Sequence, residues 1–215
     1  KYNQPNSSMV FLTDKEIDWL SINFPKLTYD QISNSISGRI DIDMHYLDNP
    51  VIKDSYNVLI DMASMTTRNE LPDVYNTDNR IINAAKKKGK PIADFHIDGN
   101  GKLCMMFPLK FSKFYPNGFE IAPFMTHLSS HLYWVSYYEL YNKEPWRGEF
   151  HGNVAMLDYF SDPSNYDLIL KNKQQLEMVR SYYKRMKGKG IALSKLRNLL
   201  KEPSFVKELF KDIRL

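Results

Sequence analysis

The hydrophobic positions near the start of the chain follow the period of an α-helix. Three apolar residues fall on one helical face: Ile17, Leu20 and Phe24. Thr13 and Glu16 have the spacing of a capping box, and Pro25 ends the run because proline cannot continue a helix. The pattern therefore predicts a helix over residues 14–23. The polar stretch before it predicts a flexible N-terminus over residues 1–12.

The next segment changes to the period of a β-strand. Apolar side chains alternate with polar ones over residues 36–47, at Ile36, Ile40, Ile42, Met44 and Tyr46. Turn-forming residues follow at 48–50. A second alternating run comes after them, at Tyr56, Val58, Ile60 and Met62. We expect the two runs to pair as a meander. Shorter apolar runs at residues 71–74 and 81–82 are further strand candidates, and a basic loop is expected at residues 86–90.

Helical spacing returns in the second half of the chain. The apolar positions from Phe119 onward are Ile121, Phe124, Met125, Leu128, Leu132 and Val135, and this helix should end before Pro145. Further helices are expected around residues 176–183 and in two short segments after Gly188 and Gly190. One helix, a run of strands and then helices alone is the order of an α+β fold. We place the main domain at residues 13–165 and a basic helical extension at residues 166–215.

Composition and charge narrow the classes of function. The chain has 215 residues, of which 43% are hydrophobic and 25% charged, and these values exclude disorder over the whole length. Residues 167–215 contain 13 Lys and Arg against 5 Asp and Glu, which gives this segment a net charge of +8. Because the whole chain has a net charge of +4, residues 1–166 carry −4. Such an extension fits an acidic partner or a solvated helical face. It lacks the interleaved aromatic residues of a nucleic-acid site, so nucleic-acid binding is not expected.

A single cysteine, Cys104, excludes an internal disulfide and a cysteine zinc site. We therefore expect a reducing, cytoplasmic location. No apolar run approaches the ~20 residues of a membrane span, and no signal-peptide pattern precedes Met9. The sequence contains no glycine-rich phosphate loop, so no bound nucleotide or other cofactor is expected. His127 and His131 lie one helical turn apart without a third ligand, which predicts helix-surface histidines and no metal.

The segment with the most reactive side chains is residues 95–105. His96, a glycine-containing turn and Cys104 lie within nine residues, and Cys104 stands eight positions after His96. This arrangement resembles the active-site segment of ubiquitin-conjugating enzymes, which has a His-Pro-Asn triplet, a glycine-containing turn and a nucleophilic cysteine eight residues after the histidine. Residues 101–104, Gly-Lys-Leu-Cys, match the ending of that segment. The resemblance covers about residues 13–160 and implies an N-terminal helix, a four-stranded antiparallel meander and C-terminal helices.

Residues 145–152, Pro-Trp-Arg-Gly-Glu-Phe-His-Gly, make the chain similar to the bacterial branch of that family, which is encoded in antiphage operons of the CBASS or ubiquitin-like conjugation type. The resemblance implies a transferase. Cys104 would accept a C-terminal glycine as a thioester from an adenylating activating enzyme and pass it to an amine. The cargo would be a ubiquitin-like modifier or the C-terminus of a cyclic-oligonucleotide synthase. Cysteine suits this step because its thiolate is a soft nucleophile that exchanges thioesters readily.

The remaining site residues follow from the same comparison. Asp98 stands where the family has the asparagine that helps the oxyanion, and a carboxylate there opposes the developing charge unless it is protonated or turned away. Asn100 is the candidate to supply an amide instead. The resemblance gives His96 the role of bracing the loop, whereas His151 is a candidate acid–base group or a helix cap. Two alternatives stay open: an inert binding module with the same fold, and Cys104 as a buried apolar side chain.

Overall fold

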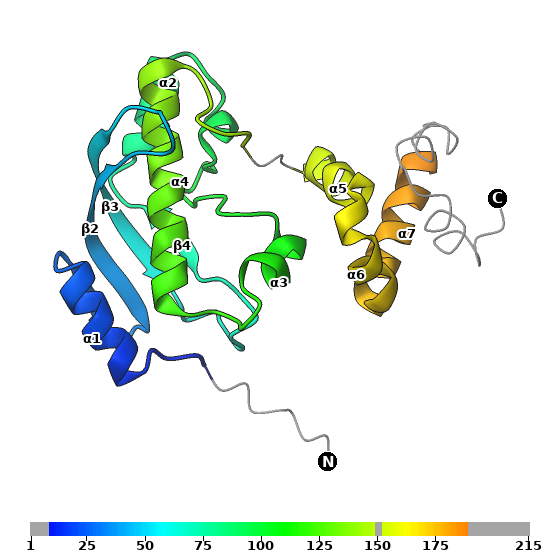
Figure 1. Ribbon diagram of the computed structural model, residues 1–215, viewed down its shortest axis with the longest axis horizontal. Helices are drawn as coiled ribbons and strands as arrows, with labels where there is room; N and C mark the ends of the chain where they lie inside the picture. The colour runs from blue at the N-terminus through cyan, green and yellow to red at the C-terminus, as the bar shows by residue number, and fades with distance from the viewer. Residues whose placement is uncertain (1–8, 149–151, 189–215) are drawn as a thin grey trace. The chain divides into compact units, whose positions relative to one another are not determined.

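The computed structural model describes residues 9–148 and 152–188 (Figure 1). The chain divides into two compact units, residues 1–148 and 149–215. The boundary expected from the sequence, at residue 165, lies inside the second unit. Tyr159 accounts for this difference, since its hydroxyl donates to the side-chain oxygen of Gln175 at 3.1 Å and ties the helices on either side of residue 165 together. None of the helices within the described ranges is both long and apolar enough to span a bilayer.

The first unit begins with helix α1, Asp14–Asn23, which confirms the predicted bounds. The Thr13 hydroxyl accepts the Glu16 amide, and a Glu16 carboxylate oxygen accepts the Thr13 amide at 2.9 Å, so the capping box is complete. The apolar face of this helix packs against the core through Leu20, which is buried. Local sequence alone is sufficient to start α1 at this point.

A four-stranded antiparallel sheet follows in the order β1-β2-β3-β4. Its strands are β1 Leu27–Asp30, β2 Ser35–Met44, β3 Ile52–Asp61 and β4 Asp73–Asn76. The pairing of β2 with β3 puts Ile36 opposite Ile60 and Ile40 opposite Tyr56, so the apolar positions of both strands share one buried face. This arrangement confirms the α+β class, the meander and the expected long strands.

Helix α4, Ile121–Tyr141, packs across the buried face of the sheet (Figure 1). Its buried residues include every apolar position that predicted it: Ile121, Phe124, Met125, Leu128, Leu132 and Val135. The helix ends at Asn142, whose left-handed φ of 53° stops the helical period before Pro145.

Helix α2, Arg80–Lys87, corrects the expectation of a strand at residues 81–82. Ile81, Ile82, Ala84 and Ala85 are all buried, whereas Asn83, Lys86 and Lys87 are exposed. Apolar residues at positions i, i+1, i+3 and i+4 form one helical face, and the isoleucine pair alone did not show it. The predicted basic loop is the last turn of this helix together with the turn at Gly89.

Short helices connect the remaining parts of the first unit. They are the 3₁₀ segments η1 Ile92–Phe95 and η2 Pro108–Lys110, and α3 Phe111–Phe114. The second unit contains α5 Gly152–Ser161, η3 Pro163–Asn165, α6 Tyr166–Lys171 and α7 Lys173–Gly188. Helix α7 confirms the expected helix around residues 176–183. The two closing helices expected after Gly190 lie outside the described residues.

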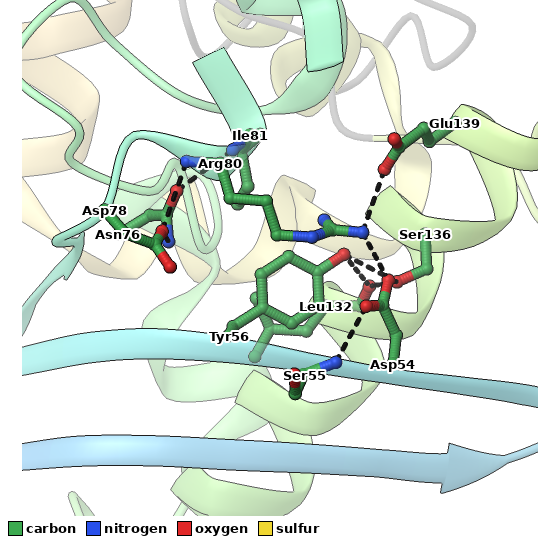
Figure 2. Close-up of polar contacts among 10 residues, drawn as sticks. All are labelled: Asp54, Ser55, Tyr56, Asn76, Asp78, Arg80, Ile81, Leu132, Ser136 and Glu139. Atoms are coloured by element: carbon green, nitrogen blue, oxygen red, sulfur yellow. Dashed lines mark hydrogen bonds and ion pairs between the residues drawn. The ribbon is translucent and has the colours of Figure 1, made fainter. Parts of the chain in front are cut away.

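Two groups of partly buried polar side chains tie the first unit together. In one of them, Arg80 of α2 binds Asp54 of β3 at 2.6 Å and Glu139 of α4 at 3.1 Å, and its guanidinium lies 4.4 Å from the ring centre of Tyr56 (Figure 2). The Tyr56 hydroxyl lies 2.5 Å from that of Ser136, which donates to Asp54 at 2.7 Å. One charged network therefore joins a strand to two helices.

The second group joins α1 to the loop after β3. Both guanidinium nitrogens Nη1 and Nη2 of Arg68 bind the Glu16 carboxylate, at 2.8 and 2.9 Å. They also donate to the backbone oxygens of Phe119 and Phe11. Burial raises the pKa of Glu16, but the hydrogen bonds from Arg68 and Thr13 and the charge of Arg68 outweigh it and lower the pKa from 4.5 to about 2.

We predict that Glu16→Gln lowers the free energy of unfolding at pH 7 by on the order of 2 kcal/mol. Because the folded pKa lies below the unfolded value, this contribution is complete above about pH 4.5 and is lost as the pH falls toward 2. Urea unfolding of both proteins across this range measures it. The exposed Asp18→Asn change on the same helix is the control. A difference between Glu16→Gln and the parent chain that stays constant down to pH 2 would contradict the ion-pair account.

Candidate active site

The residues from His96 to Cys104 form a tight hairpin. The Cys104 amide donates to the His96 oxygen at 2.7 Å, and the Asp98 amide donates to the Lys102 oxygen at 2.9 Å. Ile97 and Leu103 pair between these bonds, and both are buried. The cysteine is therefore fixed opposite the histidine by backbone hydrogen bonds, which explains why the two residues lie eight positions apart.

The hairpin continues the sheet beyond β4. The Leu103 amide donates to the Val74 oxygen at 2.7 Å, and the Asn76 amide donates to the Gly101 oxygen at 2.8 Å. Gly101 has a φ of 83°, and a Cβ there would lie 3.0 Å from the Asn76 oxygen. The position thus requires glycine, because its backbone conformation and the close approach of β4 both disfavour a side chain.

Asp98 is turned into its own hairpin. Its Oδ1 atom accepts the backbone amides of Asn100 at 2.8 Å and of Lys102 at 3.0 Å. The carboxylate therefore closes the turn in the way Asx residues close loops. Asn100 is exposed at the tip of this turn. The structure thus gives Asp98 a structural task that the family comparison did not suggest.

Cys104 is half-buried and carries a free thiol. Burial raises the pKa of the thiol, the negative charge of Asp98 raises it further, and the positive charge of Lys102 opposes both. The ammonium of Lys102 is held 2.6 Å from Asp73 of β4, which shares its charge. Cys104 is accordingly a thiol at neutral pH, and any partner that uses it as a nucleophile must take up its proton.

The ring of His96 packs into the core. The residue has a left-handed φ of 53°, which takes it out of strand alternation, and it is buried. Its ring meets Trp134 of α4 edge-on, with centres 4.6 Å apart, and lies 5.7 Å from His131. The backbone oxygen of His96 accepts the Cys104 amide, and its ring packs against Trp134. The bracing role in catalysis that the resemblance implies stays a prediction.

The two helix histidines do not both lie on the surface. His131 is buried beside His96, which corrects the expectation for that residue, since this side of α4 faces the hairpin rather than solvent. His127 is partly buried and lies 2.8 Å from the Tyr115 hydroxyl. Within residues 9–148 and 152–188, no group of three metal-ligating side chains is present.

The loop after α4 covers His96. Trp134 donates its indole N–H to the Trp146 oxygen at 3.0 Å, and the Gly148 amide donates to Glu144 at 2.9 Å. A Cβ on Gly148 would lie 2.8 Å from Nε2 of His96. The sequence motif that contains Trp146 and Gly148 therefore packs against His96, which is the first residue of the hairpin. The other candidate in this motif, His151, lies outside the described residues.

No protein-family model matches the chain, and comparisons with curated proteins and with solved structures find no match either. Any assignment of function must therefore come from the residues and geometry described above. Sequence reasoning singled out the motif that contains Gly148 but not its contact with His96, and it did not find the contribution of Trp134. The signal for Trp134 was an aromatic residue on a predicted helix, which is common in core packing.

We predict that two substitutions at Asp98 separate the effect of its charge on the pKa of Cys104 from the effect of its oxygen acceptor on stability. Asp98→Asn keeps an oxygen acceptor for the two turn amides and removes the charge, so the pKa of Cys104 should fall and alkylation at neutral pH should be faster. Asp98→Ala removes the acceptor and should cost about 1–3 kcal/mol of stability. Iodoacetamide kinetics against pH and urea unfolding measure the two effects. Equal stability of the two variants, or an unchanged thiol pKa in Asp98→Asn, would contradict this account.

We also predict that Gly148→Ala destabilises the first unit by about 1–3 kcal/mol, because the added methyl meets the buried rings of His96 and Trp134. Gly99→Ala is the matched control in the hairpin turn, since a Cβ added at Gly99 would have no heavy atom within 4 Å. Chemical unfolding followed by tryptophan fluorescence compares the two. A Gly148→Ala protein as stable as Gly99→Ala would show that the loop does not press on His96.

Proposed function

We propose that the chain is a ubiquitin-conjugating-like transferase that carries the C-terminal glycine of another protein as a thioester on Cys104. The observation that carries this proposal is the hairpin itself. It holds a half-buried cysteine opposite a buried bracing histidine, directly after an N-terminal helix and a four-stranded meander. A cysteine that only filled space in the core would not need the turn capped by Asp98 or the support of His96.

The proposed reaction has two steps that balance without a redox partner. In the first, the Cys104 sulfur attacks the carbonyl carbon of a thioester on an adenylating activating enzyme. A new S–C bond forms, the old one breaks, and the proton of Cys104 passes to the departing thiol. In the second, an amine attacks the thioester, a C–N bond forms, the C–S bond to Cys104 breaks, and the proton that the amine loses converts the departing Cys104 thiolate back to a thiol. ATP is used on the activating enzyme.

The charges around Cys104 favour particular roles in this scheme. Because the pKa of the thiol is raised, the partner enzyme must accept the Cys104 proton as the thioester is exchanged. Asn100 is the residue that the sequence offers for the oxyanion in the second step, but the hairpin register places it in the turn, at the opposite end of the hairpin from the His96–Cys104 pair. We place the protein in bacterial antiphage defence, in the cytoplasm. Its cargo is a ubiquitin-like modifier or the C-terminus of a cyclic-oligonucleotide synthase.

A catalytically inert binding module is the second candidate. Two features favour it: the carboxylate of Asp98 in place of an amide, and the raised pKa of Cys104, which lowers the thiolate fraction. In this account the hairpin is a rigid surface feature that presents Asn100 and its neighbours to a partner, and the sulfur undergoes no reaction.

An acyl-transfer assay distinguishes the two candidates. With its activating enzyme, ATP and modifier, the protein should gain one modifier mass that dithiothreitol removes, because a thioester exchanges with thiols and an amide does not. Cys104→Ser should lose the labile adduct or form a thiol-resistant ester slowly. Asp98→Asn should charge to a similar extent and discharge faster onto an amine, since it removes negative charge near the oxyanion.

Intact-protein mass spectrometry measures these adducts. A dithiothreitol-labile adduct that persists in Cys104→Ser would place the chemistry on another residue. If the chain forms no adduct with the partners that charge other carriers, the inert module is the better account.

A further inference from the structure

Large apolar side chains are exposed together at one end of the first unit. They lie in the connection between β2 and β3 and at the C-terminal end of α4: Tyr46, Leu47, Val51, Leu140 and Tyr141. We call these five residues the apolar end patch. Leu47 is 74% exposed and Leu140 61%. Isolated exposed apolar residues are normal in soluble proteins, but a cluster of this kind marks an interaction surface.

Contacts join the two segments that carry the patch. The Tyr137 hydroxyl donates to Oδ1 of Asn49 at 3.2 Å, and the Tyr133 hydroxyl donates to the Pro50 oxygen at 3.3 Å. On its other side the patch meets the loop after α4, where the rings of Tyr46 and Trp146 lie 4.6 Å apart. These contacts hold the β2–β3 connection against the C-terminal part of α4, and the two segments can be followed in Figure 1.

Leu47 is held in a strained backbone conformation. Its φ is 49°, in the left-handed region that costs a residue other than glycine or asparagine roughly 1–2 kcal/mol. Burial of the side chain does not offset this cost, since Leu47 is among the most exposed apolar residues described. Asparagine or glycine would fit the position better. Strain without a benefit to the folded chain points to a role for the side chain outside it.

Exposed lysines lie at the end of α2, which a hydrogen bond joins to the end of α4, and just beyond α4; we call them the lysine border. Lys86, Lys87 and Lys90 are exposed at the end of α2, and Lys143 follows directly after α4. Lys88 links the two segments by donating to Oδ1 of Asn142 at 3.1 Å. Among the described residues, no carboxylate lies within ion-pair distance of Lys86, Lys87, Lys90 or Lys143. The border is therefore available to negative charge.

We propose that the apolar end patch and its lysine border bind an acidic segment of a partner protein that carries apolar anchor residues. Leu47 and Leu140 would meet the anchors, and the lysines would meet neighbouring carboxylates, so that shape and charge both select the partner. This inference goes beyond acyl transfer and does not depend on Cys104.

The charges of the surface favour one arrangement of the segment. Asp48 is exposed beside Leu47, so the residues of the segment that meet Leu47 are apolar rather than acidic. The carboxylates of the segment then meet the lysines at the end of α2 and Lys143. An anionic membrane surface and a second copy of the chain are the other occupants, and the experiment below tests both.

Selection from a displayed library of short random peptides tests the proposal on the full chain, with the Leu47→Asp protein used to remove unrelated binders. We expect the enriched peptides to combine Asp and Glu with Leu, Ile or Phe. The strongest peptide, made synthetically, should bind about tenfold more weakly to Leu47→Asn and to the double variant Lys86→Glu/Lys87→Glu, and more weakly as salt rises. Ile32→Asn is the matched control, because Ile32 is 99% exposed in the β1–β2 turn, outside the patch.

Thermal unfolding supplies an independent readout for Leu47. Leu47→Asn should keep or raise the melting temperature while it weakens peptide binding, because asparagine accepts the left-handed conformation. A lower melting temperature would show that Leu47 serves the fold and would overturn the proposal. So would a failure to enrich acidic–apolar peptides, Leu47-dependent binding to vesicles of phosphatidylcholine and phosphatidylserine, or Leu47-dependent dimerisation in sedimentation velocity.

Discussion

Arg80 brings a positive charge into the packed space between β3, α2 and α4, and that charge must stay paired. Asp54 and Glu139 supply the carboxylates, and the face of Tyr56 covers the guanidinium (Figure 2). These side chains are only partly exposed, at 29% for Arg80, 21% for Asp54 and 27% for Glu139, so the loss of one carboxylate weakens the pairing of a charge that is largely shielded from water. The network holds helix α2 against both the sheet and α4. Helix α2 in turn connects β4 to the segment that leads into the hairpin.

Asn76 connects that constraint to the candidate site. Its Oδ1 atom accepts the Ile81 amide at the start of α2, and its Nδ2 atom donates to the Asn57 oxygen on β3. Its own amide donates to the Gly101 oxygen in the hairpin turn. One buried side chain at the end of β4 therefore links sheet, helix and turn. Cys104 lies in the hairpin that extends the sheet beyond β4, where the His96 backbone oxygen accepts its amide and the His96 ring packs against Trp134. Loops held in this way on rigid elements are typical of functional positions.

The elements that sequence predicted well are those in which local pattern and tertiary packing agree. Helix α1 has its complete capping signal within four residues, and the long strands β2 and β3 alternate because one face is buried. The strand predicted at Ile81 and Ile82 was wrong because a pair of β-branched residues favours a strand, whereas the burial of one face of the segment favours the helix α2. The segment of the hairpin was singled out by the spacing of His96 and Cys104 and by its glycine-containing turn, but the pairing of its two arms was not predicted. The turn-closing role of Asp98, the burial of His131 and the strain at Leu47 depend on backbone torsions and on contacts between distant segments, which no local pattern encodes.

The central claim is that the folded hairpin makes Cys104 a better acyl carrier than a cysteine in a flexible chain. The most direct measurement loads Cys104 with a short peptide ending in glycine, by exchange with a small-molecule thioester, and follows transfer to free lysine by mass spectrometry. The reference is the same thioester on an unstructured peptide with the sequence of residues 99–107. Our account predicts transfer from the protein at least about tenfold faster than from the peptide, with hydrolysis no faster, because a fixed geometry lowers the barrier to attack. Equal rates of transfer from protein and peptide would contradict it.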